Sequence, residues 1–310
     1  MKLALVLGAG GLVGIAHHIG VMCALEDELG LDQSQADLLI GTSAGSVVAA
    51  YLRTGWTPRD LMARAPDLNE AAPGPLDGGP VQLVRHGIGS AYVVARASVR
   101  IPSLLSVPPM PFLRRAFPAG VVTMGEGASI LDRELPRSWP EGRLWLAAYD
   151  LVARRRAVLG RPGQPYVPLP AAVRASCAIP GVYAPVRAGG CVLVDGGAWS
   201  LTNLDLVSLG GCDAALCIAP MSYDLARPPD RRDRLAREVP TRLLARAADR
   251  LRRQGVRVVV LSPGPDEIAV QGINLMRSGN LVQVAEVAYD AAVEQIRHLH
   301  TSGTLGGLAA

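Results

Sequence analysis

Residues 37–55 read DLLIGTSAGSVVAAYLRTG, and this stretch decides the fold. The short apolar run from Asp37 to Ser43 is typical of a buried strand, and the helical pattern that follows it directly ends at Gly55. Residues 41–45, GTSAG, satisfy G-x-S-x-G at this sharp strand-to-helix turn. Small flanking residues let the backbone hold a strained turn that exposes the serine hydroxyl at the helix N-terminus. We therefore expect Ser43 to be a nucleophile; the alternative is a serine that caps the helix.

The chain begins with a second strand–turn–helix pattern. Residues 3–7 form a short apolar run, residues 8–14 read GAGGLVG, and residues 15–28 have helical spacing that stops at Gly30. Two βα units so close together predict an α/β fold with a parallel sheet. Another helix is expected from Thr57-Pro58, further strands at 143–152, 156–160, 191–195, 214–220 and 256–263, and further helices at 171–178, 234–254 and 281–300.

The segment 66–118 differs from the rest of the chain because it is rich in proline and glycine and lacks clean periodicity. We interpret it as an insertion within a single domain of residues 1–310, serving either as a lid or as a surface loop. Both phenylalanines of the chain, Phe112 and Phe117, lie in it, which suggests contact with lipid or a cap over the site. Residues 264–310 are expected to form a helical C-terminal part.

Composition and charge favour a globular protein without an obvious nucleic-acid partner. Apolar residues make up 49% and charged residues 19%, and the net charge is +4, carried almost entirely by arginine because Lys2 is the only lysine. Such a surface suits an anionic membrane as well as a nucleic acid. The basic polar face of residues 234–254 is interpreted as a solvated face, with membrane-surface contact as the alternative.

The five cysteines are odd in number and lie among apolar neighbours, which indicates buried free thiols in a reducing compartment.

The first 25 residues require a choice between a membrane segment and a folded unit. No Asp, Glu, Lys or Arg occurs from Leu3 to Leu25, a length that suits a membrane helix or a signal peptide. Four glycines within residues 8–14, each costing a helix about 1 kcal/mol relative to alanine, argue against that interpretation. A strand–turn–helix explains the pattern better, and we expect a cytoplasmic protein that contacts membranes peripherally.

A carboxylate is the best candidate partner for Ser43. Asp195 ends the apolar run of residues 191–195 and precedes Gly196-Gly197, which let the backbone turn away and other groups approach. If Asp195 lies within hydrogen-bond distance of Ser43, its carboxylate could accept the hydroxyl proton directly, and the two residues would form a Ser–Asp catalytic dyad. The alternative is an aspartate that only forms a turn. His298 and His300 come late enough for an α/β-hydrolase triad, but only two strands precede Ser43 and both histidines sit on an amphipathic helix.

These motifs together resemble the patatin-like phospholipases. The family has a glycine-rich loop after its first strand, G-x-S-x-G after its second and a later D-G-G or D-G-A, and GAGGLVG, GTSAG and DGG occur here in that order. Residues 175–186, ASCAIPGVYAPV, are also similar to the family's segment before the aspartate. Residues 263–276 show a weaker similarity to the family. The resemblance runs from Leu3 to about Val207. It implies a three-layer α/β/α fold with a mainly parallel central sheet.

The resemblance also implies roles for particular residues. Ser43 would be the nucleophile and Asp195 the general base, while backbone N–H groups of Gly10, Gly11 and Leu12 would form the oxyanion hole. Many members carry an arginine where this chain has Val13, so no role of that arginine is transferred. The glycines that support these motifs are Gly8, Gly14, Gly41, Gly45, Gly196 and Gly197.

Two other functions are compatible with parts of the sequence. The first glycine loop resembles a relaxed dinucleotide-binding fingerprint, but that site requires an acidic residue at the end of the second strand, where GTSAG stands instead. A patatin-like fold without catalysis, acting as a membrane-surface binding protein, is the other alternative.

The expected reaction is hydrolysis, or transacylation, of an acyl ester of a lipid. Phospholipids, lysophospholipids, neutral glycerides and smaller acyl esters all fit as substrates. No metal is implied, because clustered His, Cys, Asp and Glu ligands and EF-hand-like loops do not occur in the sequence. No cofactor is implied either.

Overall fold

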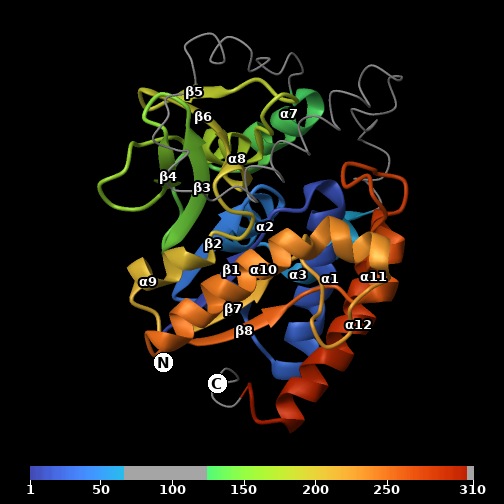
Figure 1. Cartoon of the computed structure of the whole chain (residues 1–310). Helices are drawn as coiled ribbons and strands as arrows, with labels where there is room; N and C mark the ends of the chain where they lie inside the picture. The colour runs from blue at the N-terminus through green and yellow to red at the C-terminus, as the bar shows by residue number, and fades with distance from the viewer. Residues whose placement is uncertain (66–123, 306–310) are drawn as a thin grey trace.

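The protein is built around one mixed β-sheet in a computed structural model that describes residues 1–65 and 124–305 (Figure 1). Within those residues the strand order is β5-β6-β3-β2-β1-β7-β8, and β4 pairs with β3 beside this path. Strands β3, β2, β1, β7 and β8 run parallel to one another, whereas β4, β5 and β6 are joined by antiparallel pairing. The strands are β1 Leu3–Leu7, β2 Leu38–Thr42, β3 Leu144–Asp150, β4 Arg155–Leu159, β5 Val186–Ala188, β6 Cys191–Asp195, β7 Ala214–Ile218 and β8 Arg257–Leu261.

Helices cover both faces of this sheet, which gives three layers. Side chains alternate between the two faces of each strand, so Leu39 contributes to one apolar cluster and Ile40 to the other. The first cluster includes side chains of α1, α2, α8 and α12, and the second includes side chains of α10. The helices are α1 Gly11–Leu29, α2 Ala44–Arg53, α3 Pro58–Ala63, α7 Gly125–Glu134, α8 Leu169–Cys177, α9 Val207–Gly210, α10 Arg231–Arg253, α11 Pro265–Gln271 and α12 Leu281–Thr301.

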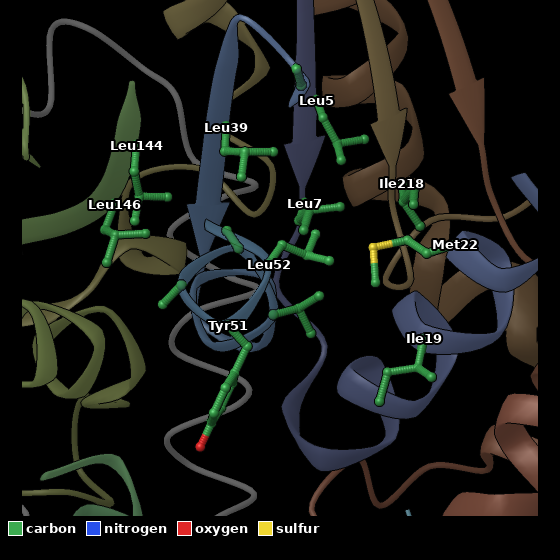
Figure 2. Packing of buried hydrophobic residues seen from close by; sticks show 14 of the residues in the cluster. Leu5, Leu7, Ile19, Met22, Leu39, Tyr51, Leu52, Leu144, Leu146 and Ile218 are labelled. Atoms are coloured by element: carbon green, nitrogen blue, oxygen red, sulfur yellow. The ribbon is translucent and has the colours of Figure 1, made fainter. Parts of the chain in front are cut away.

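The larger cluster lies where α1 and α2 pack on the sheet. Figure 2 shows Leu5 and Leu7 of β1 between Leu39 of β2 and Ile218 of β7, with Met22 of α1 against them. All five of these side chains are at most 1% exposed. Burying a leucine or isoleucine side chain contributes about 1.5–3 kcal/mol, so this contact fixes α1 and α2 on the central strands.

Local signals explain where several helices begin and end. Gly30 ends α1 with φ 62°, the left-handed conformation that glycine adopts without a steric penalty. Thr57 begins α3 with a capping box, in which its side chain accepts from the Asp60 N–H and the Asp60 carboxylate accepts from the Thr57 N–H. The Asp230 carboxylate accepts from two N–H groups at the start of α10.

Most of the expected elements are confirmed, with shifts of a few residues at their ends. The prediction that the first helix begins at Ile15 is wrong, because α1 already begins at Gly11 and takes in the end of the glycine-rich loop. Strand β5 and helices α7 and α9 were not expected, whereas α11 falls within the expected helical C-terminal part. Three of the five cysteines are buried as expected, whereas Cys177 and Cys191 are half-buried, and all five are free thiols.

The first 25 residues and the proposed insertion can now be compared with the predictions made for them. In the part of the chain that the structure describes, no helix is long and apolar enough to cross a membrane. The first 25 residues instead contain β1 and most of α1, as the strand–turn–helix interpretation requires. The proposed insertion 66–118 lies outside the described residues.

Candidate functional site

The carboxyl ends of the parallel strands bring the predicted site residues to one edge of the sheet. Leu7 is paired with Gly41 in the β1–β2 register, so the glycine loop after β1 and the serine turn after β2 leave the sheet side by side. Ala147 and Ala148 of β3 are paired with Thr42 and Asp195 respectively. Ser43 and Asp195 therefore lie at the same level on the two sides of β3, although 152 positions separate them in the sequence.

Ser43 occupies the strained turn that its motif predicts. Its φ of 52° and ψ of −120° are unusual for a residue with a side chain, and the residue is only 5% exposed. The Ser43 N–H donates to Ser176 Oγ at 3.0 Å, and that hydroxyl donates to the Ala147 carbonyl at 2.6 Å. Ser176 thus ties the turn to β3, which helps to hold the strained conformation. Ser43 occupies the N-cap position of α2, but its side chain makes no capping hydrogen bond to that helix.

Two glycines are required because other backbone atoms approach them closely. A Cβ on Gly41 would stand 2.5 Å from Ser46 Cα, and one on Gly45 would stand 2.1 Å from the Leu7 carbonyl oxygen. Both distances are far below van der Waals contact. The two motif glycines therefore allow α2 to begin directly against β1 and β2, with Ser43 held between them.

The Asp195 carboxylate lies next to the serine in a buried setting. It interacts with the Ser43 side chain, and its Oδ1 accepts from the Gly197 N–H at 2.6 Å. Burial raises the pKa of Asp195 to about 6, because desolvation outweighs the contacts with Ser43 and Gly197 that favour the ionised form. Gly196 is needed here as well, since a Cβ on it would stand 2.3 Å from the Ala147 carbonyl oxygen.

The glycine loop presents backbone donors beside Ser43. The N–H groups of Gly10, Gly11 and Leu12 have no hydrogen-bond partner in residues 1–65 and 124–305. They lie at the N-terminus of α1, where orphan N–H groups and the helix dipole favour an anion. A Cβ on Gly14 would stand 3.3 Å from Ala44 Cβ, so the first turns of α1 and α2 are in contact. The N-termini of α1 and α2 therefore lie next to each other, beside Ser43.

His18 supports this loop, a role that no sequence pattern predicted. Its Nε2 donates to the Gly8 carbonyl at 2.8 Å, and the same carbonyl accepts from the Gly45 N–H at 3.1 Å. Burial lowers the pKa of His18 to about 4, so the ring is neutral at physiological pH. A neutral ring that bonds to a carbonyl carries its proton on Nε2. The only signal in the sequence was a polar residue inside an apolar helix.

Cys177 is a second neighbour of the serine that the sequence analysis did not assign. Its Sγ lies 3.6 Å from Ser46 Oγ, and the Ser43 side chain and the Asp195 carboxylate both influence its pKa. Burial and the nearby Asp195 carboxylate raise the pKa of Cys177 to about 12. The group therefore remains a neutral thiol, which is a poor nucleophile.

Val13 takes the position at which many patatin-like proteins carry an arginine. Its side chain is fully buried and packs with Leu281 and Val284 of α12. Its N–H donates to the Leu275 carbonyl at 3.1 Å, which attaches the loop before α12 to the start of α1. An apolar contact therefore holds the glycine loop here.

Comparison with known proteins identifies the family. Residues 5–207 match the family model described as patatin-like phospholipase. Among solved structures, VipD from Legionella pneumophila is 15% identical with a TM-score of 0.44, over 95% of this chain and 67% of that chain. The type III effector protein ExoU is 18% identical with a TM-score of 0.35, over 95% and 53%. The ExoU–SpcU complex from the type III secretion system of Pseudomonas aeruginosa gives 18% identity and a TM-score of 0.29, over 97% and 61%.

The chain thus spans about half to two thirds of the length of these solved chains. The family match is the stronger finding, because it covers well over half of this chain and includes the glycine loop, the GTSAG turn and the DGG turn. The protein belongs to the patatin-like phospholipase family, a family of lipid hydrolases.

Proposed function

We propose that this protein is a serine acylhydrolase that cleaves acyl esters of lipids with Ser43 as nucleophile and Asp195 as general base. One observation carries the proposal: the buried Asp195 carboxylate interacts with the Ser43 side chain at a strained strand-to-helix turn. Family membership makes a lipid the best candidate for the acyl donor.

In the acylation step, Ser43 Oγ attacks the ester carbonyl carbon while Asp195 accepts the hydroxyl proton. The carbonyl oxygen becomes an oxyanion, for which the N–H groups of Gly10, Gly11 and Leu12 are the proposed donors. Removal of one such donor typically raises the barrier by about 3 kcal/mol. The C–O bond to the leaving group then breaks, and protonated Asp195 returns its proton to the departing alcohol.

In the deacylation step, a water molecule attacks the acyl-enzyme while Asp195 accepts its proton. The second oxyanion uses the same backbone donors, and its collapse releases the fatty acid and returns the proton to Ser43. A carboxylate with a pKa of about 6 suits both steps, because it is ionised at neutral pH and still a stronger base than an ordinary aspartate. If an alcohol attacks instead of water, the same steps give transacylation.

The proposal is tested by steady-state hydrolysis of a p-nitrophenyl acyl ester and of phospholipid vesicles by purified protein. We expect Ser43→Ala to lose all activity above background and Asp195→Asn to lose at least about 1,000-fold in kcat. Asp290→Asn serves as the matched control, since that aspartate is exposed on α12 and should leave hydrolysis unchanged. Full activity in Asp195→Asn would overturn the general base. A wild type inactive on every acyl ester would favour a non-catalytic lipid-binding protein.

A further inference from the structure

Helix α10 concentrates the positive charge of the chain. It carries nine arginines and three acidic residues, a net charge of +6, whereas the whole chain has a net charge of +4. The remainder of the protein is therefore slightly acidic. An arginine-rich coding composition would spread arginines over the whole surface, so it does not account for this localisation.

The arginines of α10 form a stripe opposite the face that packs on the sheet. Arg237, Thr241, Leu244, Ala248 and Leu251 follow one another at spacings of three and four and are buried. Figure 1 shows α10 lying over β7 and β8. The opposite face is exposed, and its spacings of four and seven also keep one side of a helix. We call it the α10 stripe: Arg231, Leu235, Arg242, Arg246 and Arg253. The same face also carries exposed Asp249 and half-buried Glu238, so it is not exclusively basic.

Most of these charges have no counter-ion in the protein. Within residues 1–65 and 124–305, only Arg242 and Arg252 among the exposed arginines of α10 form ion pairs, with Glu238 and Asp249 respectively. Arg246 has an arginine four positions away on each side, at 242 and 250, and like charges at that spacing destabilise a helix. Such an arrangement suits an anionic surface that supplies the missing counter-charge.

The N-terminal turns of α10 lie at the edge of the sheet that holds the candidate site. Arg237, in the second turn of α10, donates to the Pro220 carbonyl at 2.5 Å. Pro220 Cβ in turn would stand 3.0 Å from a Cβ on Gly10. Leu235 lies in the stripe at 68% exposure and offers an apolar side chain at the same end. Clusters of arginines on the solvent-exposed face of an amphipathic helix are typical of sites that bind anionic lipid head groups.

We propose that the α10 stripe docks the protein on an anionic lipid surface, with the candidate site at the edge of the contact. This inference rests on the proposed lipid substrate, and it adds the surface from which that substrate is taken. Each arginine near an anionic leaflet strengthens binding by about fivefold. The stripe would therefore govern how much enzyme is on the membrane, and leave the chemistry at Ser43 unchanged.

The test is co-sedimentation with vesicles of phosphatidylcholine alone and of phosphatidylcholine mixed with phosphatidylglycerol. We expect wild type to bind the mixed vesicles, with affinity that falls as salt is raised, and to bind the neutral vesicles weakly. Substituting Arg231, Arg246 and Arg253 together with glutamine should lower the partition coefficient on mixed vesicles by about 100-fold. The matched control substitutes the exposed Arg137, Arg155 and Arg187 with glutamine and should bind as wild type does.

The readouts separate this proposal from the proposed function. The α10 variant should hydrolyse a dissolved p-nitrophenyl ester at the wild-type rate, so an inactive wild type would overturn the proposed function without affecting vesicle binding. Equal binding by wild type and the α10 variant would overturn the docking surface. An equal loss of vesicle binding in both triple variants would also overturn the docking surface, because the loss would then depend only on the overall charge of the protein. Stripe-dependent binding of duplex DNA without stripe-dependent binding of vesicles would assign the stripe to a nucleic acid instead.

Discussion

The Gly45 N–H donates to the Gly8 carbonyl at 3.1 Å, and this bond joins the serine turn to the glycine loop. The same carbonyl accepts from His18 Nε2 at 2.8 Å, so a single oxygen is held from both α1 and α2. The proposed nucleophile and the proposed oxyanion donors are therefore positioned relative to each other by backbone atoms. Side chains that support this contact should affect catalysis without touching a substrate.

We expect His18→Ala to lower kcat about tenfold while KM changes little, because the Gly8 carbonyl loses a buried donor and the loop moves away from its productive position. His18→Gln, whose amide can donate to the same carbonyl, should restore most of the loss. The control is His298→Ala, an exposed position on α12. A drop in melting temperature in His18→Ala with unchanged kcat would limit His18 to a structural role.

The pH profile of kcat/KM should have an acidic limb set by Asp195. Its pKa is raised to about 6 by burial, and the protonated carboxyl cannot accept the Ser43 proton. Activity on a dissolved ester should therefore rise with pH through about 6 and level off above about 7. The residual activity of Asp195→Asn should lack this limb. A wild-type profile that stays flat from about pH 5 to about pH 7 would contradict the general-base role.

Gly45 should be the least replaceable position of the serine turn. Alanine would place its Cβ 2.1 Å from the Leu7 carbonyl oxygen, a contact that only a shift of α2 or β1 can relieve. We expect Gly45→Ala to lower the free energy of unfolding by at least about 3 kcal/mol, measured by urea denaturation. Gly127→Ala on α7, where nothing lies within 4 Å, should instead raise it by about 0.5–1 kcal/mol. Similar effects at the two positions would contradict the packing around Ser43.

Glu267 should make stability fall as pH rises. Burial raises its pKa to about 8, and its Oε1 faces His17 Nδ1 at 3.4 Å, a ring that burial keeps neutral. A carboxyl whose pKa is higher in the folded state adds stability that is complete below its unfolded pKa and lost as pH rises through about 8. Wild type should thus lose more stability between about pH 6 and pH 9 than Glu267→Gln, which stays neutral. Exposed Glu286→Gln is the control, and parallel curves for all three proteins would refute the prediction.

The sequence predicted the central strands and the serine turn well because both depend on local chemistry. Short apolar runs identified β1, β2 and β6 to within a residue, and GTSAG carries the small residues that its turn requires. Asp195 was predicted as the partner of Ser43 because it ends an apolar strand before two glycines, and the family resemblance supported that choice. Its position next to Ser43 could not be deduced from two distant motifs, because they do not give the strand order. Their proximity follows from the antiparallel insertion of β6 beside β3.

The start of α1, the role of His18 and the α10 stripe depend on tertiary contacts that no local sequence pattern predicts. The start of α1 was hidden because Gly11 and Gly14 have low helix propensity, and the helix begins there through its contacts with Ala44 and Leu275. In the sequence, His18 is one polar residue in an apolar helix, and only the structure shows that its Nε2 donates to the Gly8 carbonyl. The α10 stripe was visible as a basic face, but its opposition to the buried face and its lack of counter-ions required the structure.

The most direct test of the central claim is covalent labelling with a fluorophosphonate, followed by mass spectrometry of the digested protein. We expect a single adduct on Ser43, lost in Ser43→Ala and retained in Ser208→Ala, which alters an exposed serine. Labelling should also weaken in Asp195→Asn, because the carboxylate would no longer accept the serine proton. No adduct on the wild type, or an adduct on any residue other than Ser43, would contradict a serine hydrolase built on this site.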